Sequence, residues 1–202
     1  MSDSVVFHME HAGLSLAQEQ RDKLARFLDL LLEGNARLGL VSPKAANTLE
    51  SSLLGPCLHF SRLAVFSPPT KTVVDLGSGN GFPGIVLAIL NPHLKVLLVD
   101  SQLKRCQFLE QAVNWLSLPR VDILHARIEK LRNHAAPDIF TSWFFKDARL
   151  TAAWTRHWRT PGTRYVFFAG ASLPHHETIY NLALQAVTPL TADKVALEYL
   201  TV

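Results

Sequence analysis

The chain has 202 residues, of which 48% are hydrophobic and 18% are charged, and its formal net charge is +3. This composition excludes a fully disordered protein, because disordered chains combine low hydrophobicity with high net charge. No apolar run reaches the roughly 18 residues needed to span a bilayer, and the first residues lack the basic start of a secretory signal. We therefore expect a soluble, cytoplasmic protein without a membrane partner, whose two cysteines are free thiols.

The first 70 residues are expected to be helical. Apolar residues recur at helical spacing over 15–32, where Ser15 is expected to cap the helix and Gly34-Asn35 to end it. A second helical stretch is expected over 48–66, interrupted by Gly55-Pro56. These segments predict a helical cap.

Residues 67–70, which include two consecutive prolines, separate the cap (1–70) from a second part (71–202) of a different rhythm. In that part, helix-length segments (83–90 and 104–116) alternate with short apolar runs at 72–76, 96–99, 121–124, 139–141 and 165–168. Such runs are typical of strands buried on both faces of a parallel sheet. Two later stretches, 186–188 and 196–202, suit an antiparallel hairpin at the sheet edge. We expect a Rossmann-like α/β fold with a mostly parallel, doubly wound sheet and a helical amino-terminal extension, in one compact unit.

A glycine-rich loop leaves the first predicted strand and enters the next helix, with the sequence Asp75-Leu-Gly-Ser-Gly-Asn-Gly-Phe-Pro-Gly84. In an open α/β sheet this position borders the ligand-binding crevice. Gly79-x-Gly81-x-x-Gly84 fits a dinucleotide fingerprint. Asp75-x-Gly77-x-Gly79-x-Gly81 is instead the pattern of class I S-adenosylmethionine methyltransferases. A glycine turn without any ligand is a third interpretation.

The position of the loop favours S-adenosylmethionine. A dinucleotide fingerprint needs its first glycine directly after the strand, whereas Gly79 lies four residues beyond Asp75. The Asp75 carboxylate would repel a pyrophosphate but suits a ligand that carries sulfonium and ammonium charges. Asp100, at the end of the second predicted strand, is placed to accept hydrogen bonds from the ribose hydroxyls that both cofactors possess.

Three segments give the chain a family resemblance: Gly81-Phe-Pro-Gly-Ile85, Asp100-Ser-x-x-Lys-Arg-x-x-Phe-Leu109 and Ala126-Arg-Ile-Glu129. With them the chain resembles the bacterial ribosomal RNA small-subunit methyltransferase G family, first called glucose-inhibited division protein B, over about residues 12–170. The resemblance implies a class I methyltransferase fold and transfer of a methyl group to N7 of one guanine in 16S ribosomal RNA.

The loop pattern and the resemblance together predict the residues that contact the cofactor. These are Asp75, Gly77, Gly79, Gly81, Phe82, Asp100, Ser101, Ile128, Glu129, Ser142 and Trp143. No catalytic base is predicted, because guanine N7 carries a lone pair and attacks a methyl group without first losing a proton. No metal site is expected either, since the histidines show no ligand spacing.

The basic residues are concentrated in the middle of the chain. Residues 101–170 contain eleven basic and five acidic residues, a net charge of +6, which favours a polyanionic partner. We expect a monomer that docks ribosomal RNA or the small ribosomal subunit through Lys104, Arg105, Lys146, Arg149, Arg156 and Arg159. Trp154 and Trp158, nearby, either stack on RNA bases or pack in the core.

The chain departs from the family pattern at three places. Trp143 stands where the family has an arginine that contacts the cofactor, Ala169 stands where it has a lysine, and Ser52-Leu-Leu-Gly55 replaces a His-Ile-Leu-Asp segment. Two alternatives therefore stay open. One is a degenerate member that binds cofactor or RNA without methylating, and the other is a methyltransferase with another substrate.

Overall fold

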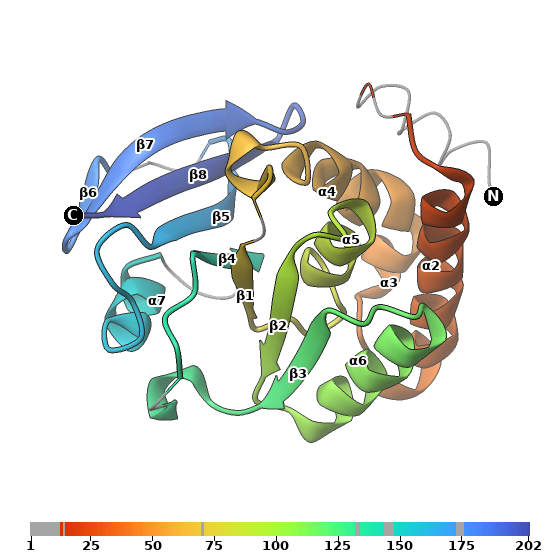
Figure 1. Cartoon of the computed structure of the whole chain (residues 1–202). Coiled ribbons are helices and arrows are strands. Elements are labelled where there is room, and N and C mark those ends of the chain that lie inside the picture. The colour runs from red at the N-terminus through yellow and green to blue at the C-terminus, as the bar shows by residue number, and fades with distance from the viewer. Residues whose placement is uncertain (1–12, 14, 70, 132–133, 144–147, 173–175) are drawn as a thin grey trace.

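The computed structural model describes residues 13, 15–69, 71–131, 134–143, 148–172 and 176–202. One eight-stranded sheet runs through it in the order β3–β2–β1–β4–β5–β8–β7–β6 (Figure 1). The strands are β1 Thr72–Leu76, β2 Lys95–Asp100, β3 Val121–His125, β4 Ile139–Trp143, β5 Arg164–Gly170, β6 Thr178–Ile179, β7 Leu182–Pro189 and β8 Lys194–Thr201. The first five pair in parallel and the last three antiparallel, which confirms the predicted sheet and its edge hairpin.

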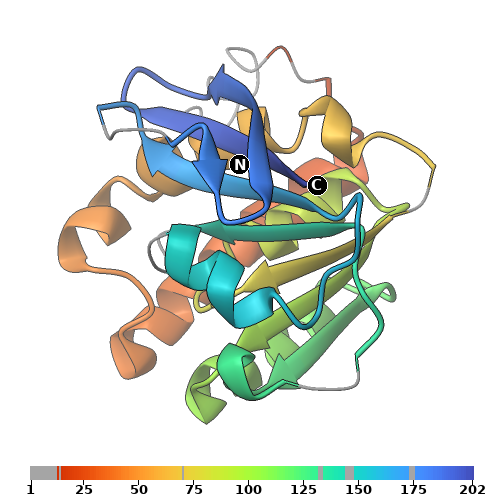
Figure 2. The same cartoon turned by 90° about the vertical axis from the view of Figure 1, so that its left-hand side faces the viewer.

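Helices cover both faces of the sheet (Figures 1 and 2). They are α2 Gln18–Leu38, α3 Pro43–Asn47, α4 Gly55–Phe60, α5 Gly84–Leu90, α6 Leu103–Trp115 and α7 Ala148–Thr155, with single turns η1 Glu50–Leu54, η2 Ala64–Phe66 and η3 Ile128–Lys130. The helices α2, α4, α5 and α6 lie on one face, and α7 lies on the other. Val73 belongs to the core on the first face and Val74 to the core on the second. Burial on both faces explains the continuous apolar runs of the central strands.

The predicted start of the first helix is wrong. Helix α2 begins at Gln18, and its N-cap is Ala17 in place of Ser15. The side-chain oxygen of Gln20 accepts a hydrogen bond from the Ala17 backbone N–H at 3.1 Å, as a residue at the third helical position does in a capping box. This bond fixes the start of the helix although Ala17 has no capping side chain.

The predicted end of this helix is also wrong, because Gly34 serves packing. A Cβ atom on Gly34 would lie 3.2 Å from the Phe108 ring of α6, so this glycine lets the two helices approach closely. The helix ends at Gly39, whose φ of +58° gives a left-handed cap. Pro56 likewise lies in the first turn of α4 and does not interrupt a longer helix, since proline is tolerated there.

The cap and the sheet share one hydrophobic core. Phe27 of α2 is fully buried, and its ring lies 5.1 Å from that of Phe82 in the glycine loop. The same cluster contains Val73 of β1 and Ile85 of α5. The division at residue 70 therefore stays a prediction about sequence organisation, while the packing is continuous across it. Within the described residues, no helix is both long enough and apolar enough to cross a membrane.

Candidate functional site

A cavity of about 450 Å³ lies at the carboxyl ends of β1 to β4. Eight of the eleven residues predicted to bind a cofactor line it: Gly77, Gly79, Phe82, Asp100, Ser101, Ile128, Glu129 and Trp143. The other three, Asp75, Gly81 and Ser142, are buried and are not part of the lining. The structure thus brings most of the predicted residues together, and their binding roles stay predictions.

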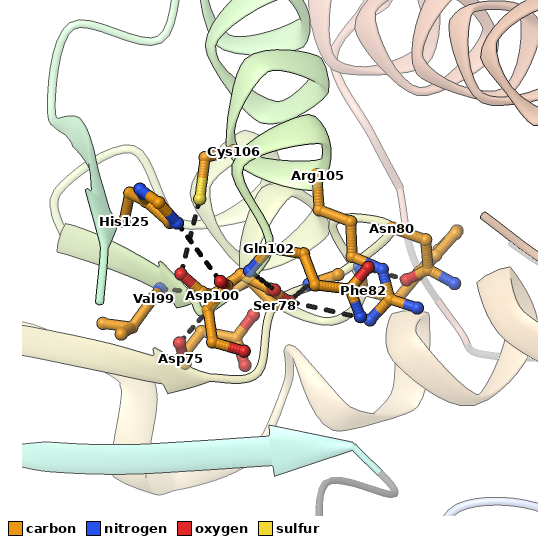
Figure 3. A network of polar contacts seen from close by, with 12 residues as sticks. Asp75, Ser78, Asn80, Phe82, Val99, Asp100, Gln102, Arg105, Cys106 and His125 are labelled. Atoms are coloured by element: carbon orange, nitrogen blue, oxygen red, sulfur yellow. Dashed lines mark hydrogen bonds and ion pairs between the residues drawn. The ribbon is translucent and has the colours of Figure 1, made fainter. Parts of the chain in front are cut away.

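Asp100 is the central acidic group of this cavity (Figure 3). Its side chain is 4% exposed, and its two oxygens accept hydrogen bonds from the backbone N–H groups of Gly79 at 2.9 Å and Gln102 at 2.8 Å. The Arg105 guanidinium lies 3.8 Å from the same carboxylate. Because each carboxylate oxygen can accept more than one hydrogen bond, Asp100 keeps acceptor capacity for a pair of ligand hydroxyls.

The glycine loop is held against the end of β2 by its own hydrogen bonds. The backbone N–H groups of Gly77 and Ser78 donate to the Val99 carbonyl at 2.8 and 3.0 Å, and the Val99 N–H donates to the Ser78 hydroxyl at 3.1 Å (Figure 3). Gly77 and Gly79 have φ angles of +71° and +49°, which favour glycine. The loop is therefore formed before any ligand arrives.

Asp75 lies beneath the loop, which the sequence interpretation did not anticipate. One carboxyl oxygen accepts a hydrogen bond from the Gly84 N–H at 3.3 Å, at the start of α5. The other oxygen has no hydrogen-bond partner among the described residues, and neither does the buried Thr141 hydroxyl. Thr141 pairs with Asp75 in the β1–β4 register, so the two side chains share one face of the sheet. Asp75 therefore lies under the loop and binds the start of α5 through the Gly84 N–H.

This placement also argues against a dinucleotide site. In the dinucleotide fingerprint, free N–H groups at the helix start bind the pyrophosphate. Here the first N–H of α5, that of Gly84, is already bonded to the Asp75 carboxyl. A Cβ atom on Gly81 would lie 2.8 Å from Ile85 and 3.0 Å from Phe27, so this glycine serves packing against the cap. Two of the three fingerprint glycines thus have structural roles away from the cavity.

Protein stability is expected to depend on the ionisation of Asp75. Burial, above all, raises the pKa of this carboxyl to about 8. The folded state therefore holds the Asp75 proton more tightly than the unfolded state does. The resulting contribution to the free energy of unfolding is complete below about pH 4 and is lost as the pH rises through about 8. Between about pH 6 and 8, urea unfolding should show wild type losing more stability per pH unit than Asp75→Asn, by up to about 1.4 kcal/mol. Asp122→Asn, at an exposed position, is the control and should follow wild type. Equal slopes for wild type and Asp75→Asn would contradict this expectation.

Several residues that line the cavity are not among the predicted cofactor contacts. Leu40 and Leu53 come from the helical cap, Asn80 from the glycine loop, and Arg127 from the segment after β3. The Arg127 guanidinium lies 3.7 Å from the Glu129 carboxylate. Arg127 could have been predicted from the sequence, because it stands directly before Ile128 in the Ala126–Glu129 segment that resembles the family. Nothing local marks Leu40 or Leu53, because only tertiary packing brings the cap to the strand ends.

The two tryptophans after β4 have different environments. Helix α7 ends at Thr155, so Trp154 lies inside it and Trp158 lies beyond it. Trp158 is buried, and its indole N–H donates to the Ala135 carbonyl at 2.8 Å, which confirms core packing. Trp154 is half-buried and lines the cavity.

The described basic residues predicted to bind RNA are divided between the two faces of the sheet. Lys104 and Arg105 lie in α6, whereas Arg149 and Arg156 lie in or just after α7, on the opposite face of the sheet (Figure 2). Of the five described members of this set, Arg105 alone lines the cavity. The guanidinium of Arg159 donates to the Ala152 carbonyl and the Asn181 side chain, so Arg159 has a structural role. Lys146 lies outside the described residues.

The matching family model and the curated relatives agree on one family. Residues 20–187 match the family described as GidB, rRNA small subunit methyltransferase G. The chain is 32% identical over 158 residues to the ribosomal RNA small subunit methyltransferase G of Pseudomonas putida, covering 78% of this chain and 72% of that one. Its counterpart from a Nocardioides species is 40% identical over 126 residues, covering 62% and 49% of the two chains.

Solved structures show the same fold. An S-adenosylmethionine-dependent methyltransferase from Aquifex aeolicus superposes with a TM-score of 0.60 at 17% identity, covering 80% of this chain and all of that one. The structure of MtNAS in complex with MTA and tNA gives a TM-score of 0.62 at 14% identity, covering 91% and 74% of the two chains. The predicted class I methyltransferase fold is confirmed.

Proposed function

Because the chain belongs to the ribosomal RNA small subunit methyltransferase G family, we propose that it methylates guanine N7 of 16S ribosomal RNA, with S-adenosylmethionine as donor. The observation that carries this proposal is that the glycine loop and Asp100 line one cavity in a chain of this family. We further propose that it acts as a monomer in the cytoplasm, on free RNA or on the small ribosomal subunit.

The chemical character of the cavity fits S-adenosylmethionine. Two acidic side chains line it, Asp100 at the end of β2 and Glu129 in η3 after β3, and they suit a hydroxylated ligand with positive charge. Gly77 and Gly79 place backbone without side chains beside them. Among the described residues, no group of three or more His, Cys, Asp or Glu side chains could hold a metal ion.

The mechanism requires alignment more than acid–base catalysis. When bound, the cofactor supplies an electrophilic methyl group on a sulfonium. Guanine N7 attacks with its lone pair, and no proton has to be removed. Asp100 and the preformed loop are therefore expected to orient the donor, while Phe82 and Trp143 keep water out of the reacting end of the cavity.

Cofactor binding is tested by calorimetric titration with S-adenosylmethionine, S-adenosylhomocysteine and NAD. We expect binding of the first two ligands and none of NAD. Binding of NAD alone would overturn the proposal, because it would make the cavity a dinucleotide site in spite of the Gly84–Asp75 hydrogen bond.

Methyl transfer is tested with radiolabelled S-adenosylmethionine and small ribosomal subunits that lack the modification, followed by nucleoside analysis for 7-methylguanosine. Absence of the product would overturn the proposal. The variant Trp143→Arg, Ala169→Lys restores the family residues and separates the alternatives. Transfer by this variant and not by wild type would identify a degenerate member, and another methylated nucleoside would identify a different substrate.

RNA binding should depend on salt through exposed basic residues such as Arg156. Each phosphate contact contributes a slope of about −0.7 to the logarithm of affinity against the logarithm of salt concentration for single strands. Arg156→Ala should therefore flatten the slope in filter binding by about 0.7 and leave unfolding unchanged. Arg159→Ala is the comparison, because loss of its contacts with Ala152 and Asn181 should lower stability. An unchanged slope for Arg156→Ala would remove this residue from the docking surface.

A further inference from the structure

Two of the three departures from the family pattern border the cavity. Leu53 and Trp143 both line it. Ala169 directly follows Phe168, whose ring stacks on that of Trp143 with centroids 4.1 Å apart and planes 5° from parallel, but Ala169 itself packs against the core on the opposite face of the sheet. Leu53 and Trp143, which are far apart in the sequence, thus line the same cavity.

The strand order identifies which end of the cavity this is. The strands that border it lie in the order β3, β2, β1, β4. Under the proposed function, Asp100 at the end of β2 holds the ribose, and Ile128, just after β3, lies at the adenine. The remaining end of the cavity, at β1 and β4, would then be left for the methionine part of the cofactor and for the acceptor. The acceptor must then approach at the wall that contains Trp143.

The described part of the wall that contains Trp143 is aromatic and neutral. The Phe168 ring that supports Trp143 is itself stacked on Phe60 at 4.1 Å, and Phe82 meets Trp143 edge-on at 6.2 Å. Leu53 adds an aliphatic surface from the cap. Among the described lining residues, the charged side chains all lie at or after the ends of β2 and β3: Asp100, Arg105, Arg127 and Glu129. Among the described residues, none of these charged side chains lines the β4 end of the cavity.

We propose that Trp143 and Phe82, which the sequence predicts as cofactor contacts, instead form with Leu53 a slot for the acceptor nucleobase, which enters unpaired and turned out of the RNA stack. A base is flat and uncharged with an apolar face, and aromatic side chains are the usual platform for unstacked bases. The inference rests on the proposed function. In the step, guanine N7 forms a bond to the methyl carbon while the carbon–sulfur bond breaks and its electron pair goes to sulfur. No proton moves, so a neutral wall suffices.

Trp143 would thereby determine recognition of the acceptor. The test therefore needs variants whose effect on acceptor binding can be measured separately from their effect on cofactor binding. Trp143→Leu should lower kcat/KM for small ribosomal subunits about ten-fold or more, because base stacking is lost, and leave the Kd of S-adenosylhomocysteine within about three-fold. Trp143→Phe, which keeps a flat ring, should recover most of the loss. Trp115→Leu, at a tryptophan that is 67% exposed on α6 and outside the cavity lining, is the matched control.

A second variant covers the case in which Trp143→Leu does not fold. Leu53→Gln should lower kcat/KM for the RNA substrate without changing the affinity for S-adenosylhomocysteine. Leu38→Gln, at another half-buried leucine of the cap, should change neither. Equal losses of cofactor and acceptor binding in the Trp143 and Leu53 variants would overturn the inference, because the wall would then belong to the cofactor site. Unchanged kinetics would also overturn it.

The same variants distinguish failure of the inference from failure of the proposed function. If wild type transfers no methyl group, the proposed function fails, and tryptophan fluorescence of the S-adenosylhomocysteine complex decides the inference. Quenching by a single-stranded RNA octamer, and not by its duplex, supports the slot if Trp143→Phe removes the quenching. Equal quenching in wild type and Trp143→Phe overturns it.

Discussion

Asp100→Ala is expected to weaken the binding of S-adenosylhomocysteine about 100-fold. A hydrogen bond to a charged group contributes about 1.5–3 kcal/mol, and the variant removes the acceptor that we assign to the ribose hydroxyls. It also releases the N–H groups of Gly79 and Gln102, so part of the loss comes from a less ordered loop. Calorimetric titration measures the change in affinity, and urea unfolding without ligand measures the effect on the fold.

Two further variants make this result interpretable. Asp100→Asn keeps the shape of the side chain but replaces one acceptor oxygen with an NH2 donor. The amide can then accept from only one of the Gly79 and Gln102 N–H groups in the present geometry, so we expect a loss of cofactor affinity between those of wild type and Asp100→Ala. Asp122→Ala, at an exposed carboxylate of β3, removes the same charge away from the cavity and should bind like wild type. An Asp100→Ala affinity within about three-fold of wild type would remove Asp100 from the cofactor site.

Gly84→Ala is expected to lower the free energy of unfolding by about 3 kcal/mol, at the upper end of the range for overpacked cores. A Cβ atom at this position would lie 2.3 Å from the Leu98 side chain and 2.7 Å from the Asp75 carboxyl. Neither neighbour can move easily, since Leu98 is fully buried in β2 and Asp75 is bonded to Gly84 itself. Denaturation by urea measures the change.

Gly39→Ala is the matched control for this substitution. Gly39 has a φ of +58°, and no atom lies within 4 Å of the place that a Cβ atom would occupy. Alanine there is therefore opposed only by the left-handed backbone strain of about 1 kcal/mol. Gly84 has no such backbone strain, which makes its expected loss one of packing alone. A Gly84→Ala variant as stable as Gly39→Ala would mean that α5 can move away from β1 at little cost.

The parts of the fold that were predictable from the sequence are those determined by local patterns. The apolar run of β1 is short and is followed directly by the glycine loop, which favours a strand buried on both faces. Its predicted bounds, 72–76, are those observed. Gly34 and Pro56 were misinterpreted because each residue type has two uses. A glycine can end a helix or let another helix approach, and only the position of Phe108 decides between them.

The site divides in the same way. Gly77, Gly79 and Asp100 lie within two short segments whose order along the chain already implies one crevice. Leu40 and Leu53 could not be predicted, since they reach the cavity through packing of the cap against Phe82 and its neighbours. The sequence indicates Asp75 as a cofactor ligand because its position after β1 is visible there, whereas its hydrogen bond to Gly84 is not.

The position of β8 has a consequence for synthesis of the chain. Strand β8 lies between β5 and β7, although it follows both in sequence, and it pairs with β5 from Arg164 to Gly170. During translation, the β5 edge therefore stays open until residues 194–201 have left the ribosome. An open edge presents unpaired N–H and C=O groups to any other nascent strand. The aggregation hazard is thus expected to be greatest after β5 has emerged and before β8 has, when most of the sheet exists and its β5 edge is unpaired.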